Sequence, residues 1–139
     1  MKENILISTG GSGGHVVPAQ TLYEHLKDEF NVFLTSDLRG SKFFENNNKN
    51  FKIINVLPLT KNIFLLPWRI AIFFFSILKS FTYLKSKKIK TIISTGGYMS
   101  LPICISAKIL NLKVILFEPN LVLGRSNLFF LNYCSSILC

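Results

Sequence analysis

Acidic side chains are scarce in this 139-residue chain, which carries 7 Asp and Glu against 16 Lys and Arg. The formal net charge of +9 indicates a negatively charged partner, such as nucleic acid, an anionic lipid surface or a phosphate-bearing ligand. Many basic residues lie between Lys79 and Lys90, directly after a very apolar stretch, and they form no extended arm. This arrangement favours an anionic membrane surface over nucleic acid. The alternative is a generally lysine-rich surface that implies no partner.

Cysteine is also rare, and Cys104, Cys134 and Cys139 show neither metal-ligand nor disulfide spacing. We therefore expect reduced thiols, no metal site and a cytosolic protein. A secretory leader is not expected either, because Lys2 and Glu3 precede only a short apolar run that is typical of a first strand. The length predicts one domain, which hides roughly two-thirds of its unfolded surface.

The segment from Ile63 to Leu78 is almost wholly apolar, but Arg69 and Pro67 interrupt it. A membrane-spanning helix needs about 20 apolar residues, so a span is not expected. Two interpretations stay open: a helix on the sheet with an unusually apolar outer face, and a helix at a membrane interface. The side chains that can face the sheet are Ile70, Phe73, Phe74, Ile77, Phe81 and Leu84. The residues expected to contact a membrane are Phe64, Leu65, Leu66, Trp68 and Arg69.

Short apolar runs alternate with segments of helical periodicity along the whole chain. This pattern predicts an α/β fold, with a Rossmann-like parallel sheet and helices on both faces. The expected strands are 5–8, 31–35, 51–58, 91–94, 113–117 and one that begins at 134. The expected helices are one from 15, a short one at 41–46, and 67–86, 102–110 and 126–133. The chain ends inside an apolar run, so we expect a truncated last strand and a missing second domain.

Two glycine-rich segments each follow an expected strand and precede a helix: residues 9–15, TGGSGGH, and residues 95–100, TGGYMS. Glycine lets the backbone approach a ligand, and a helix start offers N–H groups and a positive dipole end. Both loops lie at the carboxyl ends of parallel strands, so they are expected to face one crevice. The alternative is that the glycines only permit tight turns. The spacing is not the dinucleotide fingerprint, and no acidic residue ends the second expected strand to hold a ribose.

A third polar segment, EPNLVLGRSN at residues 118–127, follows the fifth expected strand. The carboxylate of Glu118 and the amide of Asn120 are placed there where sugar hydroxyls could be bound. The alternative for Glu118 is a loop carboxylate that caps a helix.

In their order and spacing, these three segments resemble the MurG family of peptidoglycan glycosyltransferases. That family transfers N-acetylglucosamine from UDP-N-acetylglucosamine to lipid I, undecaprenyl-diphospho-N-acetylmuramoyl-pentapeptide, to give lipid II. The resemblance implies a GT-B enzyme, in which two Rossmann-like domains face each other, and it covers only the N-terminal, acceptor-binding domain. It also implies a peripheral position on the cytoplasmic side of the bacterial inner membrane, an inverting reaction, and no cofactor or metal.

The resemblance also implies roles for single residues. Residues expected on the donor side are Ser12, Gly13, Gly14 and Asn120, and those near the acceptor diphosphate are Gly10, Gly11, Gly96, Gly97 and Tyr98. His15 and Glu118 are the candidate acid–base groups, and the sequence does not decide between them. Phe117 and Pro119 stand where the family often has His and Gln, which puts the hydrogen bonds of those two side chains in doubt.

Two other functions are weighed against an enzyme half. The first is an acceptor-binding, membrane-recruiting subunit of a split lipid-linked glycosyltransferase, and the second is a plain nucleotide-binding domain. Without the donor domain, we expect the chain not to turn over UDP-N-acetylglucosamine by itself.

Overall fold

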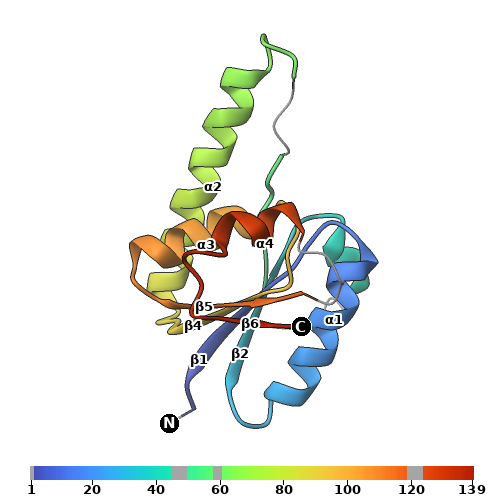
Figure 1. Ribbon diagram of the computed structural model, residues 1–139, viewed down its shortest axis with the longest axis vertical. Helices are drawn as coiled ribbons and strands as arrows, with labels where there is room; N and C mark the ends of the chain where they lie inside the picture. Colours follow the sequence, from blue (N-terminus) through green and yellow to red (C-terminus); the bar gives the residue numbers. More distant parts are fainter. Residues whose placement is uncertain (1, 45–49, 58–60, 119–123) are drawn as a thin grey trace.

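The computed structural model describes residues 2–44, 50–57, 61–118 and 124–139. They form an α/β domain around a six-stranded sheet of order β3-β2-β1-β4-β5-β6, in which every neighbouring pair is parallel (Figure 1). The strands are β1 Asn4–Ser8, β2 Asn31–Ser36, β3 Phe51–Ile53, β4 Thr91–Ser94, β5 Lys113–Phe117 and β6 Ser136–Leu138. The helices are α1 Gly13–Leu26, the 3-10 helix η1 Gly40–Phe43, α2 Leu66–Ser86, α3 Ser100–Ile109 and α4 Arg125–Phe130.

Both faces of the sheet are covered by helices, as the alternating pattern predicts. Successive strand residues point to opposite faces, so Leu6 of β1 packs with buried side chains of α2, α3 and α4. Its neighbours Ile5 and Ile7 pack on the other face with side chains of α1. The core is therefore divided by the sheet into two apolar layers, and the Rossmann-like prediction is confirmed.

Helix α2 packs on the domain through small hydroxyl side chains. Ser80 and Ser76 are buried on it, and Ser76 Oγ donates to the carbonyl oxygen of Asn55 at 2.9 Å. From α3, Ser106 Oγ donates to the carbonyl oxygen of Ile77, also at 2.9 Å. Small side chains let the two helices approach closely. The first turns of α2 stand clear of the sheet and the other helices (Figure 1).

The prediction that Ile70 and Phe74 face the sheet is wrong, because their exposed fractions are 40% and 62%. The buried residues of α2 are Ser76, Ser80 and Leu84. A search for apolar periodicity misses a stripe that is made partly of serines. In addition, the first turns of α2 extend past the sheet (Figure 1).

Several expected elements differ at their ends, four of them as follows. Strand β3 ends at Ile53 instead of residue 58, although Ile54 and Val56 beyond it are buried in the core. The short helix expected at 41–46 is a 3-10 turn that ends at Phe43, and residues 45 and 46 lie outside the described ranges. The helix expected at 126–133 ends at Phe130. The last strand is formed by residues 136–138, which pair with β5.

Candidate functional site

The two glycine loops meet at the point where the strand order reverses. Strand β1 pairs with both β2 and β4, and the connections to these neighbours run through α1 on one face and α2 on the other. In open α/β sheets, ligands bind in the crevice that this reversal creates at the carboxyl ends of the strands. The loop after β1 and the loop after β4 lie at this crevice.

The glycines of the two loops allow their backbones to pack directly against each other. A Cβ atom added at Gly97 would lie 2.8 Å from the carbonyl oxygen of Gly10, and one added at Gly10 would lie 2.8 Å from Cγ of Met99. Gly11, Gly96 and Gly97 also have φ angles of 87°, 89° and 86°, which glycine adopts without strain. Glycine is therefore required here by the contact between the loops, independently of any ligand.

His15, in the first turn of α1, is held by the second loop. Its Nδ1 lies 2.7 Å from the carbonyl oxygen of Thr95, and Thr95 Oγ1 donates to the carbonyl oxygen of His15 at 3.0 Å. A carbonyl only accepts, so Nδ1 carries the proton, and Nε2 of the neutral ring is left with a lone pair. This is the tautomer that a general base needs. His15 lines a cavity beside the loops.

Glu118 is almost completely buried, with 1% of its surface exposed. Its Oε2 accepts hydrogen bonds from the backbone N–H of Gly124 at 2.8 Å and from Nδ2 of Asn127 at 3.0 Å. Gly124 is the residue that precedes α4, so the carboxylate secures the start of that helix. These contacts match the capping alternative from the sequence.

Asn127 was not singled out in the sequence, yet it connects two of the loops. Its side chain is buried, bonds to Glu118, and has Nδ2 3.2 Å from where a Cβ atom of Gly96 would stand. The sequence signal that could have identified Asn127 is its position near the start of an expected helix, nine residues after Glu118. The spacing alone does not predict that the two side chains meet.

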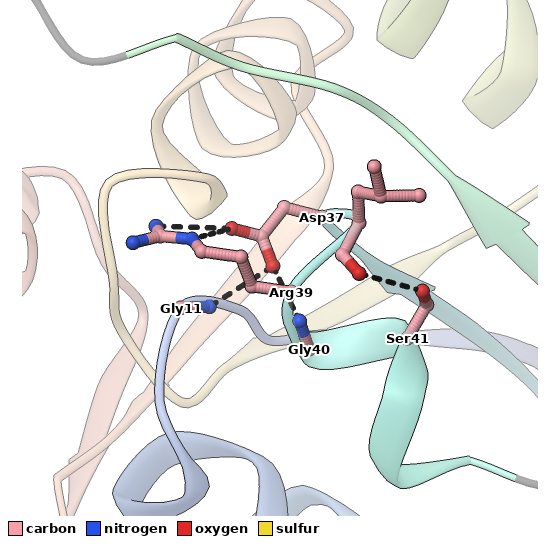
Figure 2. A network of polar contacts seen from close by, with 6 residues as sticks. Gly11, Asp37, Arg39, Gly40 and Ser41 are labelled. Atoms are coloured by element: carbon pink, nitrogen blue, oxygen red, sulfur yellow. Dashed lines mark hydrogen bonds and ion pairs between the residues drawn. The ribbon is translucent and has the colours of Figure 1, made fainter.

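Asp37, which directly follows β2, is a second residue whose role the sequence does not predict. Its Oδ1 accepts from the backbone N–H of Gly40 at 2.7 Å and of Gly11 at 3.1 Å. Its Oδ2 accepts from Nε and Nη2 of Arg39 at 3.2 and 3.1 Å. Figure 2 shows these contacts joining the first glycine loop to the turn after β2.

The second strand ends at Ser36, so no acidic residue lies within it, but Asp37 comes directly after it. The carboxylate is nevertheless used within the protein, and does not face outward as a ribose-binding acid does. Burial raises the pKa of Asp37, but the hydrogen bonds from Gly40 and Gly11 and the Arg39 guanidinium outweigh burial, so the pKa lies below its ordinary value.

A cavity of about 610 Å³ opens beside the two loops. It is bounded by helices α2, α3 and α4, and most of its walls are apolar. The lining residues are His15, Phe73, Gly97, Tyr98, Leu101, Ile105, Gly124, Ser126 and Phe129. Its volume lies in the range of small-molecule sites.

A family model described as glycosyltransferase family 28 N-terminal domain matches residues 5–139 of this chain. The chain belongs to this family. A relative from Pelagibacter ubique is 56% identical over 139 residues, which are 100% of this chain and 39% of the relative. It is named UDP-N-acetylglucosamine--N-acetylmuramyl-(pentapeptide) pyrophosphoryl-undecaprenol N-acetylglucosamine transferase. A protein of the same name from Prochlorococcus marinus is 34% identical over 144 residues, covering 99% of this chain and 38% of that protein.

Solved structures agree with this family 28 assignment at the level of the fold. The crystal structure of Acinetobacter baumannii MurG matches with a TM-score of 0.83 and 20% identity, over 97% of this chain and 40% of that one. A plant glycosyltransferase, Phytolacca americana UGT2, matches with a TM-score of 0.53 and 11% identity, over 84% of this chain and 30% of that one. The family 28 chain thus has the fold of one half of a GT-B enzyme and spans about two-fifths of the relatives' length.

The remaining predicted site residues of this family 28 domain fall around the same crevice. Ser12 and Gly14 are exposed at the start of α1, and Gly13 is half-buried there. Tyr98 is half-buried in the cavity wall. Asn120 lies outside the described residues, so its predicted contact with a donor stays a prediction.

The residues predicted to contact a membrane lie far along α2 from the sheet. Phe64 and Trp68 are 89% and 66% exposed, Leu65 is also exposed, and Leu66 and Arg69 are half-buried. They cluster at the projecting end of α2 and in the residues just before it (Figure 1). No helix in the described ranges is both long and apolar enough to cross a membrane.

Proposed function

We propose that this chain is the acceptor-binding half of an enzyme that transfers N-acetylglucosamine from UDP-N-acetylglucosamine to lipid I, giving lipid II. The observation that carries the proposal is the fixed ring of His15 at the junction of two glycine loops, in a chain 56% identical to a relative named for this transfer. The whole reaction needs a donor site as well, and this chain aligns with about two-fifths of that relative.

In this mechanism, the hydroxyl oxygen of the acceptor sugar attacks the anomeric carbon of the donor from the face opposite UDP. The new C–O bond forms as the bond to UDP breaks, and UDP leaves with the electron pair. Nε2 of His15 accepts the hydroxyl proton, because it keeps a lone pair while Nδ1–H stays on Thr95, and His15 lines the cavity. Glu118 holds the start of α4 through Gly124 and Asn127.

The proposal includes the membrane on which lipid I resides. Phe64, Leu65 and Trp68, together with half-buried Leu66 and Arg69, form the surface that we expect to enter the anionic headgroup layer of the inner leaflet. In this proposal the protein lies peripherally on the cytoplasmic side of the membrane, with its cavity toward the lipid. The net charge of +9 supports attraction to such a surface.

The test is a chimera in which this chain replaces the matching segment of the Pelagibacter ubique relative. Transfer of labelled N-acetylglucosamine from the UDP donor to lipid I is expected in the chimera. His15→Ala should lower kcat by about 10²-fold or more, whereas Val17→Ala, at an exposed position on the same helix, should not. A chimera that binds UDP-N-acetylglucosamine normally but transfers no sugar to lipid I refutes the proposal.

A further inference from the structure

The cavity beside His15 has two chemically different ends. One end is made by the glycine loops and the first turns of α1 and α4, through His15, Gly97 and Ser126. The other is made by Phe73 of α2 and by Leu101 and Ile105 of α3. The ring of Phe129, from α4, closes one side and remains 63% exposed.

These ends restrict what the whole cavity can hold. A sugar or nucleotide pushed between Phe73, Leu101 and Ile105 would lose hydrogen bonds to water, and these side chains offer none in return. An apolar group gains free energy in the same place because it leaves water. At the loop end, His15 brings the first turn of α1 to the cavity, and the positive end of that helix dipole favours negative charge. The matching ligand is an amphiphile whose anionic head is joined directly to an apolar chain.

We propose that the apolar end of this cavity binds the first isoprenyl units of the acceptor lipid, next to its diphosphate. The inference rests on the proposed function and assigns it a specific subsite. The named relatives act on pyrophosphoryl-undecaprenol, which has this order of groups. Beyond Phe73, the isoprenyl chain of the lipid leaves along the exposed side of α2, where Phe74 is 62% exposed and Ile70 is 40% exposed.

The test measures binding of a ligand series to the 139-residue chain by titration calorimetry. The probes are inorganic pyrophosphate, dimethylallyl diphosphate and geranyl diphosphate, all below micelle-forming concentrations. Pyrophosphate reports the loop end alone, and the two prenyl compounds add one and two isoprenyl units. Each buried methylene-sized group strengthens binding about fourfold. We therefore expect geranyl diphosphate to bind at least tenfold more tightly than pyrophosphate.

Variants distinguish the cavity from other apolar surfaces. Phe129→Ala should weaken geranyl diphosphate about tenfold and leave pyrophosphate unchanged. Leu128→Ala is the matched control, because Leu128 is 58% exposed on the same helix and does not line the cavity. Both side chains are largely exposed, so neither variant is expected to unfold the domain. Phe75→Ala removes an exposed ring of α2 outside the cavity and should have no effect.

The outcomes separate this inference from the proposed function. If pyrophosphate binds but the prenyl units add nothing, the subsite is wrong and acceptor binding stands. If Phe75→Ala or Leu128→Ala weakens the binding of geranyl diphosphate as much as Phe129→Ala does, the prenyl chain binds on the outer surface of the protein. The proposed subsite is then again wrong. If neither pyrophosphate nor the prenyl compounds bind, the subsite and the acceptor-binding role both fail.

Discussion

Replacing Gly97 by alanine probes the direct contact between the two glycine loops. The new Cβ atom would stand 2.8 Å from the carbonyl oxygen of Gly10, a backbone atom that cannot rotate away. In addition, alanine would have to adopt φ = 86°, which costs an L-residue about 1–2 kcal/mol. Forcing extra atoms into a packed site costs typically about 1–3 kcal/mol. We expect the free energy of unfolding to fall by about 3 kcal/mol.

Gly14 provides a control with the opposite sign. It lies inside α1 near its start, its φ is not positive, and a Cβ atom there would meet only Ser12 Oγ, at 3.8 Å. Alanine in a helix is favoured over glycine by roughly 0.5–1 kcal/mol. Gly14→Ala is therefore expected to stabilise the domain slightly.

Urea unfolding followed by far-UV circular dichroism measures both effects. With a slope of about 1–3 kcal/mol per molar urea, Gly97→Ala should lower the midpoint by more than 1 M, and Gly14→Ala should raise it. The amide signals of Thr95 and His15 should also shift in Gly97→Ala, because the two loops must separate. A midpoint for Gly97→Ala within 0.2 M (roughly 0.5 kcal/mol) of the wild type would show that the loops are not packed as described.

Two further predictions concern charge and the projecting helix. Because the folded-state pKa of Asp37 is lowered, its contribution to stability is present above its unfolded pKa of about 3.9 and is lost as the pH falls through the folded value. The Asp37→Asn side chain keeps an oxygen that can accept from Gly11 and Gly40, but it cannot ionise. In urea unfolding between about pH 2 and 6, this variant should therefore lose less stability in acid than the wild type loses. Identical pH profiles would contradict the role assigned to Asp37. In liposome flotation, the triple change of Phe64, Leu65 and Trp68 to Ser should abolish binding to anionic vesicles, whereas Val17→Ser should not; undiminished binding by the triple variant would exclude this surface as the membrane contact.

The strands and their fold class could be predicted because each strand is a short apolar run between turn residues. The meeting of the two glycine loops followed from the same reasoning, since the carboxyl ends of parallel strands lie at one edge of the sheet. Helix α2 was harder. Its packed stripe includes Ser76 and Ser80, whose hydroxyls bond to backbone carbonyls, and a pattern of apolar residues assigns such positions to the surface.

The roles of the acidic residues could not be predicted, because each depends on backbone geometry between distant segments. Asp37 bonds to Gly11, 26 residues away, across the edge of the sheet. In addition, whether Asp37 directly follows the second strand depends on where that strand ends. Strand boundaries are the least certain feature of a sequence pattern. Glu118 bonds to the backbone of Gly124 and to the side chain of Asn127, and their spacing in the sequence does not predict either contact.

Helix α2 connects the two proposals physically. Its residue Phe73 forms a wall of the cavity, and its first turn carries the exposed Trp68. With a rise of about 1.5 Å per residue, the seven residues from the start of α2 at Leu66 to Phe73 span about 10 Å.

If the exposed end of α2 rests among lipid headgroups, the cavity mouth then lies close to the membrane surface. An acceptor lipid could keep most of its chain in the bilayer while its first isoprenyl units reach Phe73 and its diphosphate reaches the glycine loops. Membrane contact and acceptor binding would thus depend on the same helix. Shortening α2 by a whole turn should impair both, even though no residue of the glycine loops changes.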